Sequence, residues 1–278
     1  MLPMIEMLLK NAELANPIEP GDYIGQDGLY YCGKCNTPKE TLVEFSGETC
    51  KARTLCHCKA AIAEERNKAK AAAKEKQRLD EFCRACIPEE KYRQSTFAAD
   101  NGSCPEAIAA AKWYVENFPA LFSENKGMMF SGSVGTGKTF AACCIANALI
   151  YTNRRVFVRE AASLIQDIAD FNKRDRTIED IKKPDLLVID DFGANQNSEF
   201  AVAKLCEIVS ARYNTAKPFI ITTNLTPKEI KDYAKSISPE QARIYDRAVE
   251  MCTCEKSPVI LNGKSIRASI AAAKHGRK

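Results

Sequence analysis

The sequence predicts an α/β fold: a five-stranded parallel sheet with helices between successive strands, preceded by a small cysteine-rich module. Three observations predict it. After about residue 96, short apolar runs alternate with helical patterns, which is the order of a doubly wound sheet. The runs at 186–189 and 219–221 are apolar throughout, as expected for central parallel strands buried on both faces. A glycine-rich segment at 132–139 separates an apolar run from an apolar helical pattern, which is typical of a phosphate-binding turn.

The chain divides into three parts by composition. Residues 1–58 are rich in glycine and cysteine, residues 59–95 form a connecting segment, and residues 96–278 carry the alternating pattern. Within the connecting segment, residues 59–82 consist largely of Ala, Lys and Glu, which are strong helix formers. We interpret this stretch as a solvated linker helix; a basic helix that faces DNA is the alternative.

The α/β part begins with a helix that Ser103 and Pro105 open and that runs through Phe118, since proline is tolerated in the first helical turn. The expected strands are 127–131, 155–159, 185–190, 218–223 and 259–261. The expected helices between and after them are 138–152, 161–172, 198–214, 227–235 and 239–251.

The net charge of +4 is mild, with acidic residues in excess before residue 59 and basic residues in excess after it. That distribution permits contact with nucleic acid without requiring it. Pro3, Glu6 and Lys10 interrupt the apolar start, which is therefore unlike a secretory signal. No apolar run is long enough to span a bilayer. We expect a cytoplasmic protein with no membrane contact.

The glycine-rich segment has the Gly-x4-Gly-Lys-Thr spacing of an ATP-binding P-loop. Its backbone N–H groups and the following helix N-terminus would hold the phosphates, Lys138 would reach the β/γ oxygens, and the Thr139 hydroxyl would ligate Mg²⁺. A glycine-rich turn that matches by chance is the alternative, which the flanking strand and helix disfavour. The predicted nucleotide-binding residues are Gly132, Ser133, Val134, Gly135, Thr136, Gly137, Lys138, Thr139 and Phe140.

Two carboxylates, Asp190 and Asp191, end the apolar run that begins at Leu186. The carboxyl end of such a strand is where open α/β sheets bind ligands. Successive strand residues point to opposite sides, so the two acids should differ in role. Asp190 would hold Mg²⁺ through water, and Asp191 would polarise the attacking water as general base. Two acids that simply end a strand are the alternative.

The order of these motifs resembles that of the AAA+ ATPases. Within them, the P-loop, Asp190-Asp191 and then Thr222-Thr223-Asn224 look like the bacterial replicative helicase loaders of the DnaC/DnaI type and the related IstB-like transposition helpers. By this resemblance, Asn224 is the sensor that orients the hydrolytic water. From the residues alone, Asn224 is more simply a cap of the turn before Pro227.

The resemblance also implies roles for three arginines. Arg243 and Arg247 stand at i,i+4 in an expected helix, where family members carry an arginine finger that completes a neighbour's site. Arg247 is favoured and Arg243 is second; a solvated basic face or a local ion pair is the alternative. Arg267, in Gly-Lys-Ser-Ile-Arg, resembles the sensor-II arginine, although Ile266 replaces the usual aromatic residue. The resemblance further implies no large helical lid.

Asp191 stands where most AAA+ enzymes have Glu, which is one methylene longer. Asp at this position is usual in the helicase loaders. The resemblance therefore implies slow, switch-like ATP hydrolysis.

Thirteen cysteines, an odd number, do not form a disulfide framework in a cytosolic protein, where thiols stay reduced. Cys32 and Cys35 precede Cys56 and Cys58 at a spacing that can close a tetrahedral Zn²⁺ site. His57 or Cys50 as a substitute ligand, a set of buried cysteines, and a redox pair are the alternatives. In one branch of the loaders, a similar N-terminal zinc domain grips the hexameric helicase. The remaining close cysteine pairs are interpreted as structural, namely Cys83/Cys86, Cys143/Cys144 and Cys252/Cys254.

Residues 170–176 between the second and third strands form a basic stretch with one aromatic residue, which we expect to be a loop. Such a segment is either a contact to single-stranded DNA or a solvated loop. The favoured function is an ATP-dependent helicase loader in DNA replication that binds single-stranded DNA and self-associates or forms a ring on a hexameric helicase. A transposition or DNA-remodelling helper ATPase is the second hypothesis. A nucleotide-dependent adaptor that barely hydrolyses ATP is the third.

Overall fold

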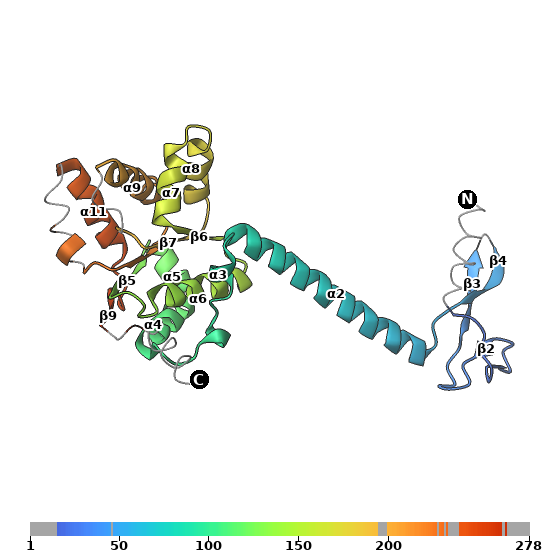
Figure 1. The fold of residues 1–278 in the computed structure, drawn as a ribbon. Helices are drawn as coiled ribbons and strands as arrows, with labels where there is room; N and C mark the ends of the chain where they lie inside the picture. The colour runs from blue at the N-terminus through green and yellow to red at the C-terminus, as the bar shows by residue number, and fades with distance from the viewer. Residues whose placement is uncertain are drawn as a thin grey trace, which may run out of the picture. The chain divides into compact units, whose positions relative to one another are not determined.

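The structure is a computed structural model that describes residues 16–45, 47–193, 199–226, 228–230, 232, 239–262 and 265. The chain divides into two compact units, Met1–Gln77 and Arg78–Lys278 (Figure 1).

The first unit is built from two short antiparallel hairpins. Strand β1 (Tyr23–Ile24) pairs with β2 (Tyr30–Tyr31), and β3 (Glu40–Phe45) pairs with β4 (Glu48–Arg53). Such short strands bury little apolar surface. Among the described residues of this unit, the buried apolar side chains are Leu29, Cys32 and Cys56.

A buried ion pair supplements this small core. The Lys39 ammonium contacts the Asp22 carboxylate, and the two side chains are only 1% and 4% exposed. Lys39 Nζ also donates to the Pro17 carbonyl at 2.6 Å. The unit therefore depends on polar contacts and on its cysteines, as small domains without a large core usually do.

Helix α2 (His57–Cys86) is longer at both ends than the predicted linker helix. Cys86 is its buried residue, and Glu64 and Lys68 form an exposed i,i+4 ion pair at 2.7 Å. The solvated character that the composition predicted is thus confirmed. At its C-terminal end, Cys83 and Cys86 pack into the core of the second unit, which supports their structural role.

The second unit contains a five-stranded sheet in the order β6-β7-β8-β5-β9, and each pair of neighbouring strands is parallel. Every predicted strand is present with its ends within one residue of the expectation. The strands are β5 (Met128–Gly132), β6 (Val156–Glu160), β7 (Leu186–Asp190), β8 (Phe219–Thr223) and β9 (Val259–Leu261).

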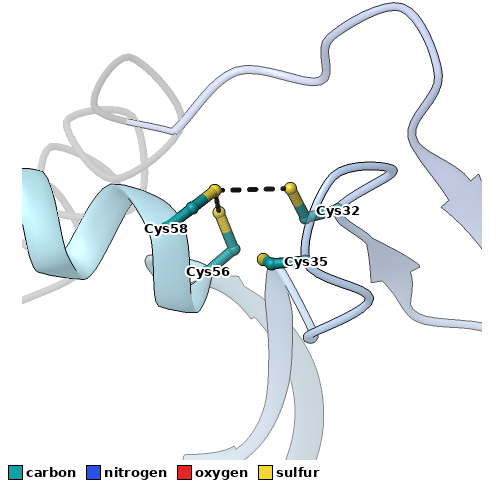
Figure 2. Close-up of side chains that lie close together, drawn as sticks. All are labelled: Cys32, Cys35, Cys56 and Cys58. Carbon is teal, nitrogen blue, oxygen red and sulfur yellow. Dashed lines mark hydrogen bonds between the residues drawn. The ribbon is translucent and has the colours of Figure 1, made fainter.

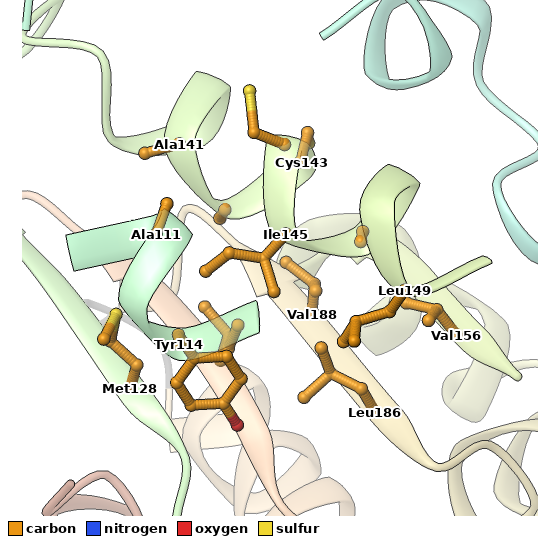
Figure 3. Close-up of a cluster of buried hydrophobic side chains, with 14 of the residues drawn as sticks. Ala111, Tyr114, Met128, Ala141, Cys143, Ile145, Leu149, Val156, Leu186 and Val188 are labelled. Carbon is orange, nitrogen blue, oxygen red and sulfur yellow. The ribbon is translucent and has the colours of Figure 1, made fainter. Parts of the chain in front are cut away.

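Alternating side chains of the strands feed two apolar cores, one on each face of the sheet. Leu186 and Val188 pack with helices α4 (Pro105–Glu116) and α6 (Lys138–Tyr151), as Figure 3 shows for α6. Leu187 and Ile189 belong to the opposite core. The helices of that core are α7 (Ala161–Ala169), α8 (Arg174–Lys182), α9 (Glu199–Tyr213) and α11 (Pro239–Met251).

The expected basic loop at 170–176 is wrong in its second half. Helix α7 ends at Ala169, and α8 begins at Arg174, so that only residues 170–173 join the two helices. Thr177 and Ile181, one turn apart, are buried and give α8 a narrow apolar face. Burial of these two side chains favours the helix. The sequence of 170–176, by contrast, shows mainly charged residues, which suggested a loop.

The predicted helix through Phe118 is also interrupted. Helix α4 stops at Glu116, and Phe118 begins a separate helix, α5 (Phe118–Ser123), after Asn117. Cys143, Cys144, Cys252 and Cys254 are buried, and burial raises the pKa of each thiol, which confirms their structural interpretation. Within the described part of the chain, no helix is both long and apolar enough to cross a membrane.

Candidate nucleotide site and cysteine cluster

The P-loop connects β5 to α6, and its glycines take conformations that other residues avoid. Gly132, Gly135 and Gly137 have φ angles of 135°, 84° and 92°. A Cβ atom at Gly132 would lie 2.2 Å from the carbonyl oxygen of Leu261, and one at Gly135 would lie 2.3 Å from Ser265 Oγ. The loop is therefore closely packed, with its backbone curled before the first turn of α6.

Lys138 opens helix α6 and turns back over the loop. Its side chain is buried, and Nζ lies 2.9 Å from the carbonyl oxygen of Gly132 and 2.7 Å from that of Ser133. The Thr136 hydroxyl donates to the same Ser133 carbonyl at 2.9 Å. The loop thus holds one positive charge at its centre, as recognition of a polyphosphate requires.

Asp190 accepts hydrogen bonds on both carboxylate oxygens. Oδ1 accepts from the Thr139 hydroxyl at 2.7 Å and from the Thr222 hydroxyl at 2.5 Å. Oδ2 accepts from the Tyr92 hydroxyl at 3.0 Å. Burial is the main cause that raises the pKa of Tyr92, so that this hydroxyl is a donor at neutral pH. Asp190 is 5% exposed, and its three donors come from α6, β8 and a segment before the sheet.

Asp191 differs from Asp190 in conformation and surroundings. Its φ of 53° is left-handed, a region that Asp tolerates better than most residues. Its backbone N–H donates to Thr222 Oγ1 at 3.0 Å, which anchors the turn after β7. Asp191 lines the cavity beside the P-loop together with Asn224, whereas Asp190 is not among the residues that line it.

A cavity of about 310 Å³ lies over the P-loop, within the size range of small-molecule sites. One wall is formed by Ala99, the last residue of the short 3₁₀ helix η1 (Phe97–Ala99), and by Asn101 and Cys104, which lie between η1 and α4. No sequence motif marks this wall. The other lining residues are Val134, Gly135, Thr136, Gly137, Lys138, Thr139, Phe140, Asp191 and Asn224.

The predicted arginines lie elsewhere or outside the described residues. Arg247, on α11, holds its guanidinium 4.7 Å from the ring centroid of Tyr213 and is not among the residues that line the cavity. The side chain of Arg243 and the whole of Arg267 lie outside the described residues.

The residues around the cavity fit ATP with Mg²⁺. The left-handed glycines, the helix N-terminus and the Lys138 ammonium suit phosphates. The Thr139 hydroxyl and the Asp190 carboxylate, 2.7 Å apart, are hard oxygen donors of the kind that Mg²⁺ prefers. Two partners of Asp190, Thr222 and Tyr92, were not predicted as site residues. Thr222 was visible only as part of a strand end, and Tyr92 carries no local signal.

In the first unit, the four predicted cysteines come together (Figure 2). The sulfur atoms of Cys32, Cys35, Cys56 and Cys58 lie within 4.8 Å of one another. Cys58 Sγ is 3.7 Å from Cys32 Sγ and 3.4 Å from Cys56 Sγ. Four thiolates at Zn–S distances of about 2.3 Å would lie about 3.8 Å apart in a tetrahedron, so the set fits Zn²⁺.

The local folds that present the cysteines are tight. A Cβ at Gly33 would lie 2.0 Å from the Gly21 carbonyl oxygen, so this glycine permits close approach of two backbone segments. The bond from the Thr37 hydroxyl lowers the pKa of Cys35, whereas the bond to Cys56 raises the pKa of Cys58. A cation at the centre would allow all four sulfurs to be thiolates.

The two alternative ligands do not join this cluster. Cys50 is exposed on β4, and its thiol contacts the Val43 carbonyl at 3.6 Å. His57 is exposed, and its backbone N–H donates to Thr37 Oγ1 at 2.9 Å. The ligand group found among the described residues consists of the four cysteines alone.

The basic segment 170–176, which joins α7 to α8 and includes the start of α8, is exposed and partly paired. The Phe171 side chain is 90% exposed. Lys173 lies 3.6 Å from Asp167, and Arg174 Nε and Nη2 both donate to Glu207 Oε1, at 2.9 Å and 2.6 Å. Positive charge and an exposed ring thus lie on one surface segment.

Comparison with known proteins identifies the family. Residues 115–270, more than half of the chain, match the family described as IstB-like ATP binding protein. The replicative helicase loader DnaC of Escherichia coli K12 is 30% identical over 129 residues, which are 45% of this chain and 51% of that protein. The replicative helicase loader DnaI of Bacillus subtilis is 25% identical over 190 residues, which are 62% of this chain and 58% of that protein.

A putative ATP-binding protein in an insertion sequence of Mycobacterium tuberculosis is 27% identical over 130 residues, which are 45% of this chain and 48% of that protein. The chain spans about half the length of the curated relatives it matches.

Solved structures resemble the fold. The crystal structure of the DnaC helicase loader covers 63% of this chain and 100% of its own, with a TM-score of 0.50 and 26% identity. That of DnaI covers 65% of this chain and 97% of its own, with a TM-score of 0.53 and 21% identity, a likeness of fold alone. The chain has an α/β AAA+ fold with a five-stranded parallel sheet, and it belongs to the family of IstB-like ATP binding proteins.

Proposed function

We propose that this protein is an ATP-dependent loader of a hexameric replicative helicase in DNA replication. The observation that carries the proposal is the four-cysteine cluster ahead of an AAA+ domain, in a chain whose relatives include proteins named replicative helicase loaders. The cysteine module, residues 1–58, would engage the helicase. The linker segment, residues 59–95, would connect it to the ATPase domain, residues 96–278.

The nucleotide site supports a role for ATP. Lys138 and the P-loop N–H groups would hold the β- and γ-phosphates, and Thr139 with Asp190 would hold Mg²⁺. That ion supplies neutralisation of phosphate charge. The Asp191 carboxylate, in the wall of the cavity, would take a proton from the attacking water. Asn224, in the same wall, would orient that water.

Two features support slow hydrolysis. Asp191 has a shorter side chain than the Glu that is usual in AAA+ enzymes, so its carboxylate reaches less far. Its left-handed backbone and the bond from its N–H to Thr222 fix the direction in which it reaches. Nucleotide occupancy, rather than rapid turnover, would then set the state of the loader.

The arginine finger would act between subunits. Arg247 is absent from the lining of the cavity of its own chain and stacks on Tyr213 of α9. Self-association, or ring assembly on the helicase, would present the Arg247 of one subunit to the γ-phosphate held by its neighbour.

Single-stranded DNA would bind at residues 170–176, which comprise the connection between α7 and α8 and the first residues of α8. An exposed ring that stacks on bases, with basic groups that follow the phosphates, is the usual combination in single-strand binders. Phe171 would provide the stacking surface, and Lys173, Arg174 and Arg176 would provide the charge.

The DNA contact can be tested by fluorescence anisotropy with a labelled oligothymidine. Phe171→Ala should weaken binding by about 5- to 150-fold, because loss of one stacked base costs about 1–3 kcal/mol. Tyr151→Ala is the matched control, since Tyr151 is also an exposed aromatic residue (69%) and lies at the end of α6. If Phe171→Ala and Tyr151→Ala bound the oligothymidine with equal affinity, the proposed DNA contact at this segment would be wrong.

The loader role is tested by mixing the zinc-replete protein with the replicative helicase of its host and recording native mass spectra. A complex that forms with ATP is the expected result. Cys35→Ser should abolish it, while Cys50→Ser should leave it intact, because Cys50 is exposed and separate from the cluster. Absence of a complex with ATP and zinc would contradict the loader role.

A transposition helper ATPase is the second candidate. The family description and the relative in an insertion sequence favour it. It predicts an ATP-dependent complex with a recombinase bound to DNA, and no complex with the helicase. The same mass measurement with each partner therefore separates the two functions.

A further inference from the structure

We propose that Tyr92 is a positioning residue for the Asp190 carboxylate and that it ties the segment after helix α2, residues 87–95, to the metal side of the nucleotide site. The inference rests on the Mg²⁺–ATP site proposed above. It assigns a function to a residue outside every motif of the sequence.

The contact is specific to one oxygen. Tyr92 lies in the four-residue helix α3 (Glu90–Arg93), is 2% exposed, and donates from its hydroxyl to Asp190 Oδ2 at 3.0 Å. The other oxygen, Oδ1, is occupied by the hydroxyls of Thr139 and Thr222. Tyr92 is thus the hydrogen-bond donor to Oδ2 among the described residues.

Tyr92 is itself held in place by the helix that carries the P-loop lysine. Asn147 of α6 donates from Nδ2 to the carbonyl oxygens of Tyr92 and Ser95, at 2.8 Å each. Arg93 Nη1 donates to the carbonyl oxygen of Ile87 at 2.7 Å. These bonds hold residues 87–95 together and attach the backbone of Tyr92 and Ser95 to α6.

A carboxylate held from both sides keeps one orientation. With Thr139 and Thr222 on Oδ1 and Tyr92 on Oδ2, the plane of the Asp190 carboxylate is set before any ion arrives. Groups that orient a metal-binding carboxylate typically change metal affinity 10- to 100-fold when they are removed. The Tyr92 hydroxyl orients the carboxylate of Asp190, the residue expected to hold Mg²⁺, in this way.

The hydroxyl can be separated from the packing role of the ring. Phenylalanine would fill the same buried space and leave Asn147 bonded to the backbone of residue 92. A residue that merely packs would tolerate this change. A positioning residue would lose its effect on the metal while the affinity for metal-free nucleotide stays the same.

Coupling must also run in reverse. If the Tyr92 hydroxyl favours metal binding at Asp190, metal binding favours the Tyr92–Asp190 contact by the same factor. Residues 87–95 should then exchange their amide protons more slowly when Mg²⁺ and nucleotide are both present than with nucleotide alone.

The test compares Tyr92→Phe with the wild-type full chain. A fluorescent ATP analogue, mant-ATP, is held at fixed concentration and Mg²⁺ is titrated, with a parallel nucleotide titration in EDTA. We expect the half-saturating Mg²⁺ concentration to rise about 10-fold, and the affinity in EDTA to match that of the wild type. Hydrogen exchange should show that Mg²⁺ no longer adds protection at residues 87–95.

Tyr114→Phe is the matched control. Tyr114 is likewise a buried tyrosine of the same core, and its hydroxyl donates to the Lys126 carbonyl at 3.0 Å, away from the site. It should leave the Mg²⁺ titration unchanged. In an Asp190→Asn background, Tyr92→Phe should cause no further change, because the carboxylate it positions is gone.

The outcomes separate this inference from the proposed function. If Tyr92→Phe had the same half-saturating Mg²⁺ concentration as the wild type, the role of Tyr92 would be overturned and the proposed ATP site would be unaffected. Equal weakening in EDTA and in Mg²⁺ would show a purely structural residue and would also overturn it. A wild-type protein without Mg²⁺-dependent nucleotide binding would overturn both.

Discussion

The Thr139 hydroxyl donates a hydrogen bond to Asp190 Oδ1 at 2.7 Å, joining the start of helix α6 to the end of strand β7. These residues are 51 positions apart in the chain. They meet because the parallel strands β5 and β7 end at the same edge of the sheet, so that the turns after both strands lie together.

Lys138→Ala should reduce ATP affinity by more than about 100-fold, since the ammonium is the positive charge at the centre of the loop and charge-assisted bonds contribute about 1.5–3 kcal/mol each. Isothermal titration with ATP and Mg²⁺ measures the change. Lys183→Ala is the control, because that side chain is 62% exposed and outside the cavity lining. Tight binding by Lys138→Ala would refute the site.

Asp191→Asn should lower the turnover number for ATP by about 10²- to 10⁴-fold, because the amide cannot accept the proton of the attacking water. ATP affinity should stay near that of the wild type, since Asp191 lies in the cavity wall rather than on the phosphates. Steady-state phosphate release and equilibrium binding report the two quantities. Wild-type chains that bind ATP but release no phosphate would favour the adaptor hypothesis instead.

Metal analysis should find about one zinc ion per chain, with the sulfurs of the four-cysteine cluster as ligands. Cys35→Ser should lose the ion and unfold the first unit, because this unit buries little apolar surface of its own. Cys50→Ser, an exposed cysteine outside the cluster, should retain it. A folded first unit that holds no metal would contradict the zinc site.

Arg247→Ala should lower ATP hydrolysis in assemblies of this protein, and mixing should restore part of it. A Lys138→Ala subunit cannot bind ATP but still carries an intact Arg247. Added to Arg247→Ala subunits, it would supply the finger to a neighbour's site, so that two inactive variants become active together. Phosphate release from the mixture is the measurement.

The alternative role of Arg247 is the stack on Tyr213. If that contact alone matters, Arg247→Ala lowers the Tm, and mixing restores no activity. Tyr213→Phe keeps an aromatic ring beneath the guanidinium and should leave hydrolysis unchanged in either case.

Arg212 should be among the most sensitive positions for stability in the second unit. Its guanidinium is fully buried and donates to the backbone carbonyl oxygens of Ile181, Pro184, Asp185 and Pro218. Burial lowers the pKa of Arg212 to about 9, which still leaves it charged at neutral pH. These bonds tie α9 to the turns that lead into β7 and β8.

Arg212→Met should destabilise the unit by about 3 kcal/mol or more, because it leaves buried carbonyl groups without donors. The corresponding drop in Tm is about 6–12 °C. Arg176→Ala, on an 88% exposed side chain, should change the Tm by less than 1–2 °C, about the effect of an ordinary surface substitution. Differential scanning calorimetry distinguishes the two, and equal Tm values would show that the Arg212 bonds are not needed.

Much of the second unit was predictable because its signals are local. The apolar run Leu186–Ile189 and the turn at 132–139 each determine their own conformation, and the alternation of strands with helices then predicts a parallel sheet. In the segment 170–176, the expected loop matches residues 170–173, but the expected helix 161–172 extends three residues beyond α7, and α8 was missed. Thr177 and Ile181 form a narrow buried face of α8, which packs with α7 and α9. The sequence of this segment gives no sign of that packing.

The cysteine cluster shows the same division. The spacing of Cys32, Cys35, Cys56 and Cys58 predicted which thiols would meet. The two members of each pair are close in the chain, so only one loop has to close to bring the two pairs together. The sequence left His57 and Cys50 open as ligands. The structure separates them, because residue 50 is committed to strand β4 and residue 57 turns outward at the start of α2.

The surroundings of Asp190 were predictable only in part from the sequence. The sequence by itself determined the P-loop, the paired acids and their place at the edge of a parallel sheet, because each depends on neighbours in the chain. Only the tertiary structure decided that Tyr92 and Thr222 bond to Asp190 and that Ala99, Asn101 and Cys104 wall the cavity. A hydrogen bond between residues 98 positions apart requires the whole sheet and its helices to be in place, and no pattern of neighbouring residues encodes it.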